Sequence, residues 1–174
     1  DSAMADMVFG RRGVLGGAAA LALPGIASAQ IEPIKIGEIN SYSAQPAFLQ
    51  PYRQAWALAV EQVNAAGGIH GRPIATIHRD DAGKPEDAVR HAGELVNAEK
   101  VTLLAGGFLS NVGLALGDYA SQNKKLFVAS EPLTDAIVWS KGNRYTFRLR
   151  ASTYMQCAML VEEDRAGRAW CKAN

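Results

Sequence analysis

Short apolar runs alternate with longer amphipathic runs from residue 34 onward. Apolar residues at every second position, or filling a short run, are typical of strands, whereas spacings of three and four are typical of helices packed on a core. The pattern predicts strands at 34–39, 73–78, 101–104, 126–129 and 145–149. It predicts helices at 48–65, 85–97, 111–122 and, as a short helix, 132–138, with a last helix that begins near Ser152.

This alternation of strands and helices predicts βαβ units. The expected fold is therefore α/β, a Rossmann-like parallel sheet flanked by helices. The wholly apolar run 101–104 is typical of a central strand covered on both faces. Beyond Glu162 the apolar periodicity is lost, and an irregular tail is expected there.

Residues 1–29 carry the three-part pattern of a secretory signal peptide. Arg11 and Arg12 precede the apolar run 14–23, and cleavage is expected after Ala29. The apolar run is too short to cross a bilayer, so we expect no membrane span after cleavage. The signal predicts export to the periplasm, by the Sec route or, because the paired arginines resemble a twin-arginine signal, by the Tat route.

The composition adds exclusions. With 48% hydrophobic residues and 20% charged residues, the chain is globular and not disordered. A balance of 18 Lys+Arg against 17 Asp+Glu gives no support to a nucleic-acid partner. His70, His78 and His91 lack the spacing of metal ligands, and neither a G-x-S-x-G elbow nor a phosphate-binding fingerprint is present. We therefore expect no metal, no cofactor and no catalytic residue.

Ligands of an open parallel sheet bind beyond the carboxyl ends of its strands. Ser110 and Asn111 begin a predicted helix there, where unpaired N–H groups and the helix dipole favour a carboxylate. Ser110 is equally suited to a simple N-cap. The other candidates come from the neighbouring loops and are Ser43, Ser130, Pro132 and Thr134.

Several stretches together resemble the leucine/isoleucine/valine-type, or type I, periplasmic substrate-binding proteins of ABC importers. They are 34–37, 63–73, Asp80 with Asp81, 84–89, 106–110, 127–130 and 145–148, preceded by the export signal. The resemblance covers residues 34–163. It implies two Rossmann-like lobes joined by hinge strands, with a small-molecule ligand held in the cleft between them. An ABC permease is the partner that it implies.

The resemblance also implies roles for individual residues. Ser110 matches a hydroxyl that holds a ligand carboxylate, and Thr134 matches a second hydroxyl. Pro132 falls where a backbone carbonyl receives an amino group. Phe48 matches an aromatic residue near the ligand, and Tyr154 lies just past the first hinge crossing. The expected ligand is a small carboxylate, such as a branched-chain amino acid or an aromatic acid.

Two departures from the family pattern affect these expectations. Residues 43–45 read Ser-Ala-Gln where many relatives have Ser-Gly-Pro, so that side of the site differs. We expect the second lobe, which in the family supplies the acidic partner of an α-amino group, to be missing from these 174 residues. We expect residues 1–29 as signal peptide and upstream residues, 30–151 as the first ligand-binding lobe, and 152–174 as the start of a second lobe with a truncated or frameshifted tail.

Two alternatives stay open at this point. A doubly wound sheet also supports enzymes, and Asp80, Asp81 or Ser130 would then act beside a nucleotide or sugar. An extracytoplasmic ligand-sensing domain would share the binding chemistry and differ only in its downstream partner.

Overall fold

A computed structural model describes residues 32–173 of the chain, with side chains up to residue 165. The expected signal peptide at 1–29 lies outside the described residues. Within 32–173, no helix combines the length and the apolar character that a bilayer crossing needs.

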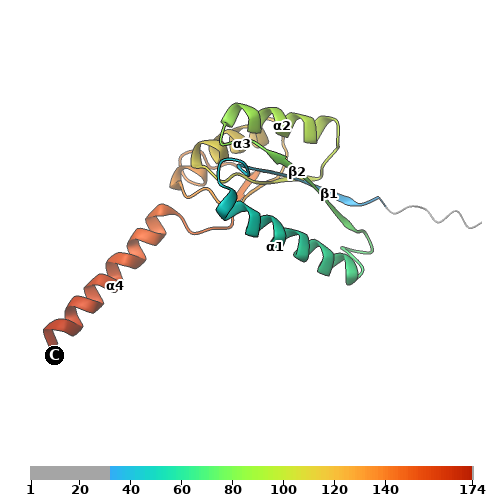
Figure 1. Cartoon of the computed structure of the whole chain (residues 1–174). Coiled ribbons are helices and arrows are strands. Elements are labelled where there is room, and N and C mark those ends of the chain that lie inside the picture. Colours follow the sequence, from blue (N-terminus) through green and yellow to red (C-terminus); the bar gives the residue numbers. More distant parts are fainter. Residues whose placement is uncertain (1–31, 174) are drawn as a thin grey trace, which may run out of the picture. The chain divides into compact units, whose positions relative to one another are not determined.

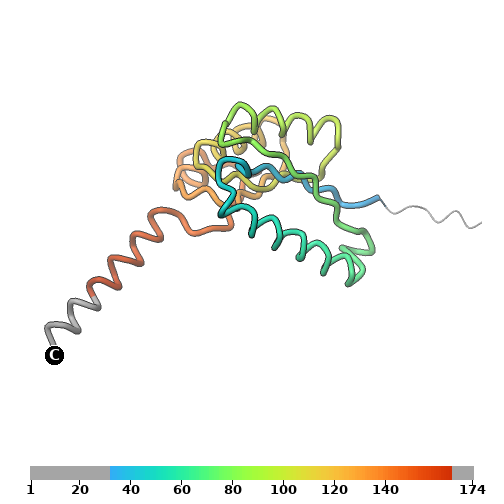
Figure 2. Tube along the Cα trace, in the orientation of Figure 1, coloured from blue at the N-terminus to red at the C-terminus, as the bar shows by residue number. Residues whose placement is uncertain are grey.

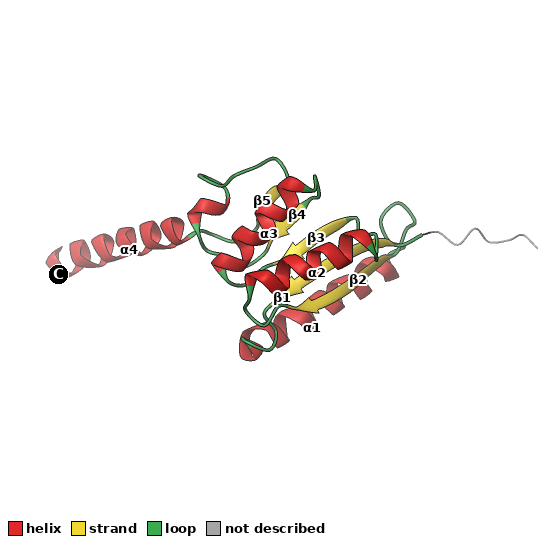
Figure 3. Cartoon of the chain, turned by 90° about the horizontal axis from the view of Figure 1, so that it is seen from above, coloured by secondary structure: helices red, strands yellow, loops and turns green. Residues whose placement is uncertain are grey.

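Five parallel strands form one sheet in the order β2-β1-β3-β4-β5. The strands are β1 (Ile34–Asn40), β2 (Ile74–Asp80), β3 (Leu103–Gly106), β4 (Phe127–Ala129) and β5 (Thr146–Arg148). The helices are α1 (Pro46–Ala65), α2 (Pro85–Asn97), α3 (Ser110–Gln122), the single 3-10 turn η1 (Asp135–Ile137) and α4 (Thr153–Ala173). Helix α1 covers one face of the sheet, and α2 and α3 cover the other (Figures 1 and 3). The α/β parallel-sheet prediction is confirmed.

The main core lies between the sheet and the α2–α3 layer. Strand β1 contributes Ile39, β3 contributes Leu104 and β4 contributes Phe127, all fully buried. The helices contribute small and apolar side chains that repeat at helical spacing, namely Ala88, Ala92, Leu95, Val112, Leu116 and Ala120. Burial of these side chains is the main favourable term that holds the layers together.

Three predicted boundaries need correction. The third strand begins at Leu103, because Val101 still closes the end of α2 by donating its N–H to the Leu95 carbonyl. The predicted helix 132–138 shrinks to the turn η1, since the Thr134 hydroxyl caps Ala136 only two residues on. The last helix runs unbroken to Ala173, so the expectation of an irregular tail was wrong. Glu, Arg and Ala dominate that segment, and their helix propensity does not require an apolar face.

Helix α4 is attached to the rest of residues 32–173 through its first turn. The Thr153 N–H donates to the Leu133 carbonyl at 2.9 Å, and the Tyr154 N–H donates to Asp135 Oδ2 at 3.1 Å. Beyond Gln156, every described side chain of α4 is exposed. The tube in Figure 2 shows the helix leaving the sheet-bearing part of residues 32–173.

The turn after β3 depends on two glycines. Gly106 has φ +108°, and a Cβ there would lie 2.1 Å from the Ile39 carbonyl oxygen, so no larger residue fits. Gly107 has φ +77°, and its N–H donates to the same carbonyl at 2.8 Å. The pair turns the chain sharply from the central strand into α3, and so places residues 108–111 at the carboxyl end of the sheet.

Candidate functional site

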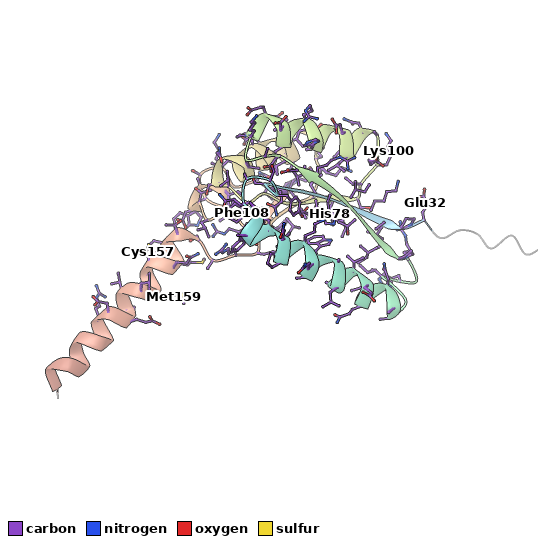
Figure 4. All side chains as sticks on the ribbon, viewed as in Figure 1. Glu32, His78, Lys100, Phe108, Cys157 and Met159 are labelled. Carbon is purple, nitrogen blue, oxygen red and sulfur yellow. The ribbon has the colours of Figure 1, made fainter. Side chains whose placement is uncertain are left out.

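The candidate site lies at the carboxyl ends of the strands. Phe108 lies at the end of the sheet near the start of α1, and Lys100 and Glu32 lie at the opposite end (Figure 4). Because all five strands are parallel, the segments that follow β1, β3, β4 and β5 all emerge at this end.

A chain of contacts joins these segments. The Phe48 ring, in the first turn of α1, lies with its centroid 5.2 Å from that of Phe108. The Arg150 guanidinium lies over the Phe48 ring, 5.8 Å from its centroid, within the range of a cation–π contact. Arg150 Nη1 also donates to Glu131 Oε2 at 2.7 Å. We call Phe48, Phe108, Glu131 and Arg150 the carboxyl-end cluster.

Tyr52 and Ser130 continue the same surface. The Tyr52 hydroxyl, one turn after Phe48 in α1, donates to Ser130 Oγ at 3.3 Å. Burial raises the pKa of the Tyr52 hydroxyl well above its ordinary value, so it stays a neutral donor at any physiological pH. The contact fixes α1 against the segment that follows β4.

A buried polar group lies behind this surface, on the α1 side of β1 and β2. Glu38 is fully buried, and its Oε2 accepts from the Tyr42 hydroxyl at 2.6 Å and lies 2.9 Å from His78 Nδ1. Its Oε1 accepts from Asn40 Nδ2 at 3.1 Å. Burial, followed by the charge of Glu38, raises the pKa of the Tyr42 hydroxyl far above its ordinary value. The carboxylate is thereby satisfied from three sides, which is what makes its burial tolerable.

The adjacent acids Asp80 and Asp81 differ in environment. Asp81 is buried, and its Oδ1 accepts from Ser41 Oγ at 2.6 Å and from the Gly83 N–H at 2.7 Å. Burial raises the pKa of Asp81 in spite of these bonds. At Asp80, slight desolvation is outweighed by N–H donors from Ala82 and Ser43, and the pKa is lowered. Both acids therefore tie loops together, as structural residues do.

Comparison with known proteins assigns the chain to a family. The family model for the periplasmic binding proteins matches residues 33–171, which is most of the chain. The chain belongs to the periplasmic binding protein family. It is a family of binding proteins and not of enzymes, so the alternative of a doubly wound enzyme loses its support.

Individual relatives agree with this membership. A Leu/Ile/Val-binding protein homolog of Brucella melitensis is 32% identical over 139 residues, which are 79% of this chain and 37% of that protein. A solute-binding protein of an ABC transporter from Rhodopseudomonas palustris, solved with 3,4-dihydroxybenzoic acid, matches with a TM-score of 0.62 at 25% identity. The match covers 69% of this chain and 32% of that protein's chain.

A second solved relative is a branched-chain amino acid transporter substrate-binding protein from Streptococcus pneumoniae, in complex with isoleucine. It matches with a TM-score of 0.60 at 26% identity, and the match covers 70% of this chain and 34% of that protein's chain. The chain described here therefore spans about a third of the length of these relatives.

The structure places the predicted site residues in two groups. Phe48 belongs to the carboxyl-end cluster, and Ser110, Asn111 and Ser130 lie on the segments that carry it. Ser110 is the first residue of α3 and Leu109 is its N-cap, so the simple capping alternative for Ser110 was wrong. Within the described part of the chain the Ser110 hydroxyl has no hydrogen-bond partner, and Asn111 is exposed.

The other predicted residues make structural contacts. Thr134 Oγ1 accepts from the Ala136 N–H at 3.3 Å and caps η1. Pro132 is buried against α3 at Gly113, and Ser43 is exposed, with its N–H directed to Asp80. The Tyr154 ring lies 5.8 Å from that of Trp139, beside η1, where it is 62% exposed.

Sequence reasoning missed the charged half of the site. Glu131 and Arg150 were not singled out, although both follow predicted strands at the carboxyl end of the sheet. Each lies two residues after a strand, Glu131 after β4 and Arg150 after β5, and that position was the available signal. Across the part of the chain that the structure describes, no three His, Cys, Asp or Glu side chains gather as a metal site.

Proposed function

We propose that this protein is an exported solute-binding receptor of an ABC importer that binds a small carboxylate, such as a branched-chain amino acid or an aromatic acid. The observation that carries the proposal is the convergence of an aromatic pair, an arginine and an unpartnered helix-start hydroxyl at the carboxyl end of the sheet. Such an end offers apolar contact together with donors for an anion.

Family membership supports the rest of the proposal. One solved relative holds isoleucine and another holds a dihydroxybenzoic acid, both small carboxylates. Residues 30–151 would supply the first lobe of the site, and the segment from residue 152 onward would begin the second. This protein would act in the periplasm, and an ABC permease would be its partner. The extracytoplasmic sensor alternative predicts neighbouring genes for a kinase or cyclase in place of permease and ATPase genes.

Calorimetry on the full-length protein that carries this segment tests the proposal. Amino acids and hydroxybenzoates are titrated separately, and binding of one class is expected. Ser110→Ala should weaken binding by about 1–3 kcal/mol, because a hydrogen bond to a charged group is lost. Ser121→Ala, near the far end of the same helix, is the matched control and should leave the affinity unchanged. A folded protein that binds neither class would refute the proposal.

A further inference from the structure

The ion pair between Arg150 and Glu131 is held in place from two directions. The Arg150 guanidinium lies over the Phe48 ring, and Glu131 follows Ser130, whose hydroxyl accepts a hydrogen bond from Tyr52. The Glu131 side chain is only 12% exposed and that of Arg150 is 39% exposed, so the acid is sheltered while the guanidinium reaches the surface. Contacts within the chain therefore support both residues of the pair.

The pair keeps unused hydrogen-bonding capacity of both signs. Arg150 uses Nη1 for Glu131, and its other N–H donors have no hydrogen-bond acceptor among the described residues. Glu131 accepts through Oε2, and its Oε1 receives no donor from those residues. A guanidinium presents two N–H edges suited to carboxylates, and a carboxylate oxygen suits an ammonium group.

We propose that Arg150 and Glu131 together recognise a zwitterion, with the α-carboxylate on the free edge of Arg150 and the α-ammonium on Glu131 Oε1. The four charges then alternate in sign around a ring, so the ion pair need not open for the ligand to bind. The Phe48–Phe108 pair lies beside it and gives apolar contact to a side chain. This inference rests on the proposed function and narrows its ligand class to α-amino acids.

The same geometry disfavours a simple aromatic acid. Its carboxylate would satisfy Arg150, but it would cover Glu131 without offering an ammonium, and desolvating a carboxylate without a new partner is costly. Selectivity would therefore come from Glu131, and overall anion affinity from Arg150. The two residues thus predict separable phenotypes.

Calorimetry on the full-length protein separates these roles. The probes are leucine, 4-methylpentanoate, which is leucine without its ammonium, and 4-hydroxybenzoate. The wild type should bind leucine at least about tenfold more tightly than either acid. Glu131→Gln should weaken the binding of leucine by about tenfold or more, so that its affinity comes close to that of 4-methylpentanoate. Arg150→Gln should weaken the binding of all three probes.

Matched controls are Glu61→Gln, in the second half of α1, and Arg144→Gln, which precedes β5 at the other end of the sheet. They make the same charge changes and should leave binding intact. Circular dichroism and a thermal melt confirm that each variant folds. Preference for 4-hydroxybenzoate, or leucine binding that is unchanged in Glu131→Gln and Arg150→Gln, overturns the inference and leaves the proposed function standing. No binding of any probe by the folded wild type overturns both.

Discussion

Alanine at Gly113 should destabilise the protein, although the same change normally stabilises a helix. Gly113 lies in α3, and a Cβ there would lie 2.7 Å from Pro132 Cγ and 2.8 Å from Pro132 Cβ. Carbon atoms in good contact are about 3.5–4.0 Å apart, so α3 and the segment after β4 would have to separate by about 1 Å. The proline ring cannot rotate away as a long side chain would.

The magnitude follows from two opposing terms. Replacing glycine by alanine inside a helix gains about 0.5–1 kcal/mol, and overpacking a core costs about 1–3 kcal/mol. Gly113→Ala should therefore lower the free energy of unfolding by up to about 2.5 kcal/mol. Gly93→Ala in α2 is the matched control, since the atom nearest to its Cβ is Tyr119 Oη at 4.0 Å, and only the gain applies.

Urea denaturation followed by far-ultraviolet circular dichroism measures both variants, with the shift in midpoint compared at a constant m-value. Gly113→Ala should also weaken ligand binding, because Pro132 directly follows Glu131 and moves with it. Gly93→Ala should not. If the two variants were equally stabilised, the close approach between α3 and Pro132 would be wrong.

Three further predictions concern the rest of the chain. Glu38→Ala should lower the free energy of unfolding by about 3–5 kcal/mol, because His78 and two other side chains lose the buried carboxylate that they contact. Urea titration measures this loss. Asp81→Asn should match or exceed the wild type at pH 7. Its advantage should shrink as the pH falls through the raised pKa of Asp81 towards about 4, where protonation removes the buried charge, as urea titrations across that range would show. Met159→Gln and Leu160→Gln should each change the free energy of unfolding by less than about 0.5 kcal/mol in the same assay, since both side chains are exposed.

Local signals were enough for the architecture. The period of the apolar residues separated strands from helices, and the alternation of the two predicted a parallel sheet. Boundaries failed where a backbone bond from another element decided them, as at Val101, which closes α2 before β3 begins. The order β2-β1-β3-β4-β5 was not predicted, because strand neighbours depend on contacts between distant segments.

Of the candidate site, the sequence predicted the uncharged residues, such as Ser110 and Phe48, and not the ion pair. Hydroxyls at predicted helix starts are visible in a sequence, because capping positions are local. The pairing of Arg150 with Glu131 joins residues 19 positions apart on different loops, and no local pattern encodes it. Glu38 is a similar case, because a lone acid in a strand is expected to face water until its partner His78, 40 positions away, is known.

Because α4 is attached through its first turn, a small rotation at that turn would move the other end of the helix much farther. Its 21 residues, at about 1.5 Å per residue, give an arm of about 31 Å, and a rotation of about 10° at its base would carry the far end through about 5 Å. The base is held by the Leu133 carbonyl and the Asp135 carboxylate, which lie on the segment that Glu131 and Pro132 open. A small displacement of that segment would therefore be magnified at the far end of the described part of α4.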